Sequence, residues 1–318
     1  MNKLVYKLTT AVSTAALLTG SVASVAFGTT TVTISGNGSD SDNTSNVSVN
    51  RSTSIYQTNT ANIQNNVNID ANTGNNDAND NTGGDVEIST GDANVSSSVS
   101  NSANSNVASV GCGTCDGDTN VKISGNGTGS DNDANVGLNS VTKLVQKNVA
   151  DVENNVDDDA KTGKNDAEDN TGGDVTIDTG DADVKVDVTN EVNQNVASVS
   201  GGQGGDVDVE ISGNGSDSDN TVNLGINSLT DVFQNNYADI QNDIDVDAKT
   251  GKNDANDNTG GDVEIKTGDA DVEVDVDNKA NFNGLDLSDC DCEMDLAVKV
   301  AGNGSESNND ANIGLNSA

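Results

Sequence analysis

Hydrophobic and polar residues alternate along much of this chain. Between residues 61 and 71 every second position is apolar except for one Asn: Ala61, Ile63, Asn65, Val67, Ile69 and Ala71. The same pattern returns in residues 238–248 and, with more Val, in residues 182–190 and 270–278. A period of two is typical of strands that bury one face, and β-branched residues favour strands. These segments therefore predict half-buried β-strands.

Two segments also fit the period of a helix. One contains Val141, Leu144, Val145, Val149, Val152 and Val156, and the other contains Leu229, Phe233, Tyr237, Ile240 and Ile244. A helix is the alternative there. The matching segment of the first repeat has Ser52 and Thr60 and is rich in Asn, which is a poor composition for a helix. The strand interpretation is therefore favoured.

Long internal repeats organise the chain. The string GNG recurs at Gly36, Gly125, Gly213 and Gly302, in steps of 89, 88 and 89 residues, and the strings TGG and TGDA recur with the same spacing. We predict a leader at residues 1–28, repeats at 29–116, 117–205 and 206–293, and a partial fourth repeat at 294–318.

A finer rhythm lies inside each repeat. In the second repeat, Ala134, Ala150, Ala167, Ala182 and Ala197 lie 15 to 17 residues apart. Strands are commonly about 5 to 6 residues long, so this spacing predicts coils of about 16 residues, each with two short strands. Roughly 18 such coils would form a rod about 85 Å long.

The predicted fold is all-β. The turns are rich in Gly, Asn and Asp, which accept positive φ or hydrogen-bond to their own backbone. A β-solenoid of stacked short strands with Asn/Asp/Gly turns is the first choice, and tandem β-sandwich repeats are the alternative. In a solenoid, the inward Asn side chains would form ladders, because stacked coils place equivalent amides about 4.8 Å apart.

Short glutamine and asparagine strings suggest a family resemblance. The Q-x-N-x-A strings at residues 57–61, 146–150 and 234–238, together with the TG-x-N-D-A strings, resemble fragments of curlin repeats. Curlins stack strand-turn-strand units into secreted fibres, so the resemblance implies a matrix or fibre function. The repeat of this chain is longer, poorer in Gln and more acidic than a curlin repeat.

The amino terminus has the pattern of a secretory signal. Lys3 and Lys7 precede an uncharged stretch that is rich in small residues, and cleavage after Ala26 or Gly28 would fit the small-residue rule. A membrane anchor is the alternative, but the apolar run is short and diluted by Ser and Thr. We therefore expect a secreted or cell-surface protein that does not insert into a membrane after cleavage.

Charge excludes one class of partner. The chain has 14 basic and 52 acidic residues, a net charge of −38, and removal of residues 1–28 with their two Lys would make it −40. Nucleic-acid binding needs clustered Lys and Arg, so no nucleic-acid partner is expected.

The composition also argues against an enzyme. The chain has no Pro, His or Trp and only three Tyr and three Phe. Serine–histidine and cysteine–histidine pairs are thus absent from the sequence, and little aromatic surface is left to build a substrate cleft. We predict that the protein is not an enzyme.

Calcium is the candidate cofactor. Oxygen-bearing side chains alternate before a Gly-Gly turn in each repeat, as a hard cation requires. The candidate ligands are Asp77, Asn79, Asn81 and Asp85 in the first repeat, Asp166, Asn170 and Asp174 in the second, and Asp254, Asn256, Asn258 and Asp262 in the third. A metal-free ladder of Asn/Asp turns is the alternative.

Four cysteines lie near the ends of the first and third repeats, as Cys112, Cys115, Cys290 and Cys292. In an exported protein an even number of cysteines suggests disulfides. Local bridges within each pair are the first choice, ahead of intermolecular bridges and a zinc site.

These observations predict a non-enzymatic exported structural protein, a subunit of an extracellular matrix, fibre or surface layer. An adhesin or a calcium-dependent surface-binding module is the alternative. The expected partners are other copies of the chain, joined head to tail because GNG-containing segments lie near both termini, or other surface components.

Overall fold

The computed structural model of the chain describes residues 6–22, 29–110, 117–201, 205–289 and 295–318. All regular structure in these residues is β. The strands are β1 (Tyr6–Val22), β2 (Thr30–Ser35), β3 (Asp42–Asn72), β4 (Val86–Ser89), β5 (Ala93–Val110), β6 (Thr119–Ser124), β7 (Asp131–Lys161), β8 (Val175–Asp178), β9 (Ala182–Gly201), β10 (Val207–Ser212), β11 (Asp219–Lys249), β12 (Val263–Lys266), β13 (Ala270–Asp289), β14 (Leu296–Ala301) and β15 (Asn308–Ser317).

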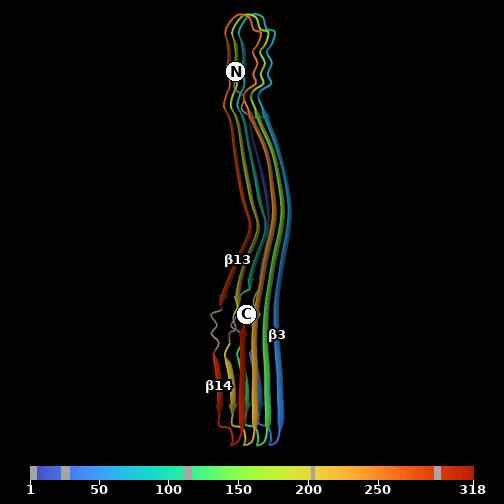
Figure 1. The fold of residues 1–318 in the computed structure, drawn as a ribbon, viewed down its shortest axis with the longest axis vertical. Helices are drawn as coiled ribbons and strands as arrows, with labels where there is room; N and C mark the ends of the chain where they lie inside the picture. Colours follow the sequence, from blue (N-terminus) through green and yellow to red (C-terminus); the bar gives the residue numbers. More distant parts are fainter. Residues whose placement is uncertain (1–5, 23–28, 111–116, 202–204, 290–294) are drawn as a thin grey trace.

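Each repeat forms one coil of a flattened β-solenoid (Figure 1). In the first coil, β2 leads through a tight turn into β3, which runs from this turn to the hairpin tip. The chain reverses at a hairpin tip, residues 73–85, and returns through β4 and β5. The second coil repeats this path with β6–β9 and the third with β10–β13, and β14 and β15 begin a fourth.

Every strand pairs in parallel with the equivalent strand of the next coil. The long strands form one sheet in the order β15-β11-β7-β3, which we call the long sheet. The return strands form three shorter sheets, ordered β1-β5-β9-β13, β14-β10-β6-β2 and β12-β8-β4. Within the long sheet Asp42 pairs with Asp131, Asp131 with Asp219 and Asp219 with Asn308, so the register equals the sequence repeat.

The core lies between the long sheet and the return sheets. Alternate residues of β3, β7 and β11 point inward and meet inward residues of the return strands, so that Val67 and Val156 pack in one cluster with Val95 and Val184. The apolar clusters repeat along the molecule from the turn near Gly36 to the hairpin tip. The core is thin because Ala and Val fill most of its positions.

The GNG turns have a backbone reason for their glycines. Gly36, Gly125, Gly213 and Gly302 have φ between 66° and 71°. Residues other than Gly rarely adopt this left-handed backbone conformation. The turn is therefore reproduced in every coil by the same residue type.

The prediction of a β-solenoid is confirmed, but the predicted size of its coil is wrong. A coil takes 88 or 89 residues and not about 16, so the described chain makes three coils and part of a fourth in place of roughly 18. Strands β3, β7 and β11 have 31 residues each, about 100 Å at 3.3 Å per residue, and are therefore not the short strands expected. The 15- to 17-residue rhythm of Ala is a spacing along the coil.

Two alternatives from the sequence are also wrong. Tandem β-sandwiches would keep strand pairing within each repeat, whereas the pairing connects successive repeats. The segments with helical spacing lie within β7 and β11. Their alternation of inward and outward residues continues without a break, and burial on one side of a sheet decides in favour of strands.

The predicted leader overlaps β1, which pairs with β5 from Tyr6 opposite Ala93 to Val22 opposite Val110. Cleavage after residue 28 remains a prediction, and it would uncover the edge of β5. Among the described residues, no helix is long and apolar enough to cross a membrane.

Candidate functional site

Amide ladders run through the core along the stacking direction. Asn65 Nδ2 donates to Asn154 Oδ1 at 2.7 Å, and Asn154 Nδ2 donates to Asn242 Oδ1 at 2.7 Å. A second ladder from the return strands runs beside it, with Asn101 donating to Asn190 at 2.7 Å. The two ladders also bond across the core, since Asn65 Nδ2 donates to Asn101 Oδ1 at 2.9 Å. The inward Asn residues form ladders as the sequence predicted.

Further ladders give the core a second polar zone. Asn106 donates to Asn195 at 3.0 Å and Asn195 to Asn283 at 2.9 Å. Gln146 donates back to Gln57 at 2.8 Å, opposite to the direction of the Asn ladders. Buried amides are costly unless they are bonded, and these ladders satisfy them by repetition.

Each ladder has a direction, which makes one coil a template for the next. An amide both donates and accepts, so every member of a ladder has a partner on each side except at the ends. The last described Asn of a core ladder offers a donor and the first offers an acceptor. Translation of a coil along the stacking axis would match all these groups at once.

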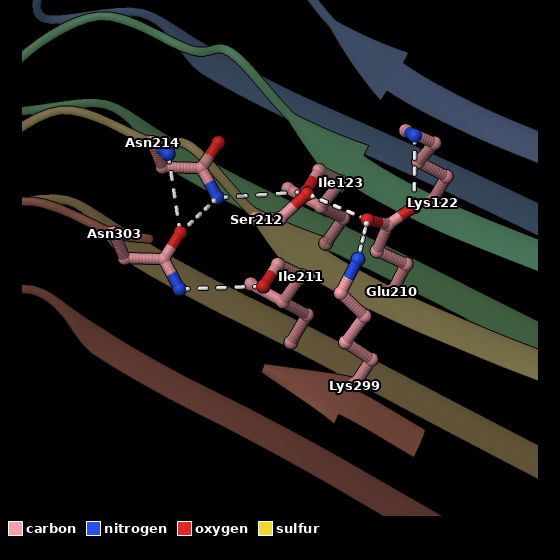
Figure 2. Close-up of polar contacts among 8 residues, drawn as sticks. All are labelled: Lys122, Ile123, Glu210, Ile211, Ser212, Asn214, Lys299 and Asn303. Atoms are coloured by element: carbon pink, nitrogen blue, oxygen red, sulfur yellow. Dashed lines mark hydrogen bonds and ion pairs between the residues drawn. The ribbon is translucent and has the colours of Figure 1, made fainter. Parts of the chain in front are cut away.

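The turns carry ladders of the same kind (Figure 2). Asn214 donates its Nδ2 to Asn303 Oδ1 at 3.0 Å and its backbone N–H to the same oxygen at 3.1 Å. Asn303 Nδ2 donates to the carbonyl of Ile211 at 3.3 Å. One asparagine thus fixes the position of two successive turns.

One carboxylate joins three coils by charge. Glu210 lies between Lys122 of the preceding coil at 2.8 Å and Lys299 of the following coil at 3.0 Å (Figure 2). Hydrogen bonds from Lys122, Lys299 and Ser212 lower the pKa of Glu210 to about 2.

The predicted calcium ligands lie at the hairpin tip and stack in columns. Asp77 bridges to Asp166, and Asp166 bridges to Asp254. Asp85 Oδ1 accepts the backbone N–H of Asp174 at 3.0 Å. In the same way, Asp174 Oδ1 accepts the backbone N–H of Asp262 at 2.9 Å.

The Asn candidates are also engaged in the stack. Asn79 Oδ1 accepts the backbone N–H of Glu168 at 2.5 Å, and Asn81 Nδ2 donates to Asn170 Oδ1 at 2.9 Å. Asn258 Oδ1 accepts the backbone N–H of Asn170 at 2.9 Å. Within the described parts of the chain, no three acidic, Cys or His side chains are grouped to hold a metal. Calcium binding therefore stays a prediction.

Acidic groups at the tip repel one another. Asp166 raises the pKa of Glu168, with smaller contributions from desolvation and Asp254. A cation at the tip would relieve this repulsion, whether it is bound at a site or only attracted to the surface. Cys112, Cys115, Cys290 and Cys292 lie outside the described residues, so their pairing also stays a prediction.

The last complete coil has an open edge in the described structure. The inward side chain of Val186 in the second coil is 0% exposed, whereas its equivalent Val274 in the third coil is 41% exposed. Val272 and Val276 beside it are also exposed. β14 and β15 cover only β10 and residues 219–228 of β11. The remaining edge offers both backbone groups and an apolar stripe to another strand.

The pattern of equivalent positions marks one further residue, Asp158, that the sequence interpretation did not single out. It is 0% exposed and occupies an inward position held by Ile69 in the first coil and Val246 in the third. Its two carboxylate oxygens have no hydrogen-bond partner of normal geometry, and neither has the hydroxyl of nearby Ser97. Desolvation is the main cause of the raised pKa of Asp158. The hydroxyl of Ser97 acts in the opposite direction, and the charges of Asp157 and Asp159 raise the pKa further.

Comparisons with protein-family models, curated proteins and solved structures found no match to this chain.

Proposed function

We propose that this protein is a non-enzymatic, exported structural subunit whose coils stack into an extracellular fibre, matrix or surface layer. The observation that carries the proposal is the unbroken register of backbone pairs and amide ladders from coil to coil. A coil built in this way presents on one side the groups that the other side of an equivalent coil accepts.

The same property supports self-association as the mode of action. A strand edge with apolar side chains pairs readily with another strand. The edge left open at β13 carries the residue types that β9 uses to bind β13, because Val272, Val274 and Val276 are equivalent to Val184, Val186 and Val188. We infer that a further coil, from another copy joined head to tail, adds to this edge.

Export is supported by the signal-like pattern of residues 1–28. The mature charge is compatible with a surface role, because a high net charge keeps thin, open-edged coils soluble until they meet a matching edge. Calcium or another divalent cation would lower the repulsion between stacked carboxylates such as Asp42, Asp131 and Asp219, which pair in one column.

Electron microscopy of the purified mature protein, with and without calcium, tests the proposal. We expect filaments in which the strands run across the axis, with the 4.8 Å repeat of stacked strands. Val274→Lys should stop elongation, because it places a charge in the stacking edge. Asp275→Lys is the matched control, because Asp275 is exposed and lies next to Val274 on the opposite, outward face of the strand. Protein that stays monomeric at high concentration in both conditions would overturn the proposal.

A further inference from the structure

The outer face of the long sheet is divided by charge. From Thr44 to Thr60 and at the paired positions of the later coils, the outward residues are mostly Asn, Gly, Ser, Thr and apolar, and we call this surface the neutral half. Its charged outward side chains among the described residues are Asp133, Lys143, Lys147, Asp231 and Asp310. From residue 62 to residue 72 and at paired positions, nine of the eighteen outward residues are Asp or Glu, all but Asp70 in the second and third coils, and we call this surface the acidic half. Depletion of charge together with exposed aromatic residues is typical of the centre of an interface.

An open groove crosses the neutral half along the stacking direction. Its floor is formed by Ser48, Gly137, Gly225 and Gly314, and its volume is about 850 Å³. An outer Asn ladder, in which Asn135 donates to Asn46 at 2.9 Å, lines one side of the groove. A second outer ladder, in which Asn139 donates to Asn50 at 2.8 Å, runs along the other side of the glycine column.

The glycines of the groove floor are not required by the backbone. Gly137, Gly225 and Gly314 are not among the residues with positive φ, and a Cβ added at any of them would meet no atom within 4 Å. Gly in the middle of a strand lowers stability, and one recognised reason for it is close approach of another molecule. The glycines therefore leave space for an occupant.

An apolar ridge lies on the same face, eight residues along each strand from the groove. Tyr56, Val145 and Phe233 form one column of paired residues. Tyr56 is 65% exposed and Phe233 is 53% exposed. Tyr237, which lies on the same face four residues after Phe233, is 60% exposed. Large aromatic side chains this exposed on a sheet face indicate a binding surface.

The groove and the ridge are placed so that two copies fit each other. Consider a two-fold axis that is parallel to the stacking direction and passes through the column of Ser52, Val141 and Leu229. Rotation about this axis reverses the direction of the strands in the second copy and leaves the stacking direction of its coils unchanged. It brings the ridge of each copy opposite the groove of the other, because Ser48 and Tyr56 lie four residues either side of Ser52. Both copies would then stack in the same direction.

Charge agrees with this arrangement. The same axis places Lys147 opposite Asn135 of the second copy, beside Asp133 of the second copy in the adjacent outward column. The acidic halves of the two copies extend in opposite directions, away from each other. The interface is bounded where the acidic column of Asp131 would meet that of Asp151.

The area is sufficient for a specific complex. Seventeen residues of strand across three to four coils cover roughly 800 to 1,000 Å² at 3.3 Å per residue and 4.8 Å per strand. A standard interface buries about 800 Å² on each partner.

We propose that the neutral half of the long sheet binds a second copy of this chain, with ridge in groove, and so joins two stacks side by side with their coils running in the same direction. The pairing itself does not require stacking, but its use in joining stacks rests on the proposed structural function.

Sedimentation velocity on the mature protein carrying Val274→Lys, which blocks stacking, tests the pairing in isolation. We expect a dimer. Replacing the three aromatic residues by Ser (Y56S, F233S and Y237S) should weaken dimerisation at least tenfold, and so should filling the groove with G137T and G225T. The matched control, Q64S with N66S and Q241S, changes outward residues of the acidic half and should leave the dimer intact. Circular dichroism checks that each variant keeps its strands.

A charge exchange identifies the contact. Lys147→Asp should weaken the dimer, and Lys147→Asp combined with Asp133→Lys should restore it. These residues lie 14 positions apart in β7, about 46 Å, so they cannot contact each other within one copy, and rescue indicates contact between two copies. A monomeric parent protein, groove and ridge variants that dimerise normally, or binding of a neutral polysaccharide by a face that does not dimerise would each overturn the inference.

Electron microscopy without the Val274→Lys change separates this inference from the proposed function. Filaments one stack wide would overturn the pairing and leave the structural function standing. Dimers that never elongate would support the pairing and contradict the function.

Discussion

Replacing the buried Asp158 by Val should make the protein more stable. The side chain is fully buried in a column where Ile69 and Val246 hold the equivalent positions, so Val matches the shape of the site. Both carboxylate oxygens of Asp158 lack hydrogen-bond partners. The substitution therefore removes an unsatisfied polar group and adds apolar burial.

The magnitude follows from these two contributions. Burying a Val side chain contributes about 1.5 to 3 kcal/mol, and an unsatisfied buried polar group costs about 1 to 3 kcal/mol. Because Ser97 keeps its unpaired hydroxyl, we expect a net gain of about 2 to 4 kcal/mol in the free energy of unfolding at neutral pH. With an unfolding entropy near 2.1 cal/mol/K per residue, the Tm of a chain of 318 residues would rise by about 3 to 6 °C.

Thermal unfolding followed by circular dichroism between pH 7 and pH 3 measures the effect and its cause. The pKa of Asp158 is raised in the folded state, so the folded protein takes up a proton at higher pH than the unfolded chain. The destabilisation by Asp158 is then complete above its folded pKa and fades as pH falls towards 3.8. The advantage of the Val variant should shrink over that range, with Asp158→Asn as the isosteric control. A Val variant no more stable than the parent at pH 7 would refute the reasoning.

Three further predictions concern the Asn ladders, the ion pairs of Glu210 and the binding of calcium. Asn190→Ala should lower the free energy of unfolding by about 2 to 4 kcal/mol, because it removes the oxygen that accepts from the buried amides of Asn101 and Asn154. Asn139→Ala on the outer face should cost under about 0.5 kcal/mol. Urea unfolding compares the two variants, and equal losses would contradict the ladder account. Glu210 has a lowered pKa of about 2, so its ion pairs should stabilise the fold above pH 4.5 and be lost as pH falls through about 2, and Glu210→Gln should remove that part of the pH dependence of Tm. Calcium should raise Tm more than magnesium at matched ionic strength, and Asp174→Ala should reduce the difference. Equal effects of the two ions on Tm would mean that they only screen the negative charge, and would contradict a specific calcium site.

The sequence was sufficient to predict the strands and the ladders because both depend on local alternation. Ala61, Ile63 and Val67 are inward at every second position, and Asn65 lies among them where a stacked amide can bond. The buried face of a strand and the bonding of an inward Asn follow from these patterns with no knowledge of the path of the chain.

The prediction of a coil of about 16 residues was wrong, because it assumed a typical strand length of about 5 to 6 residues. β3 alternates without interruption from Asp42 to Asn72, with neither Pro nor Gly in it, and this continuity is the signal for one long strand. The steps of 88 and 89 residues were visible in the GNG turns and give the register directly. The groove at Gly137 could not be predicted from the sequence, since it depends on strands of three coils and of the partial fourth coil lying side by side.

Spin labels at two pairs of outward residues test the size of the coil most directly. Gln64 and Glu153 are 89 residues apart and pair across neighbouring strands, with their side chains 2.9 Å apart. Ser48 and Gln64 are 16 residues apart in the same strand, about 53 Å at 3.3 Å per residue. In a variant with all four Cys replaced by Ser, electron paramagnetic resonance should show strong dipolar broadening for labels at 64 and 153, and a distance near 50 Å for labels at 48 and 64. A short distance between labels at 48 and 64, with no broadening between 64 and 153, would contradict the stack of long coils.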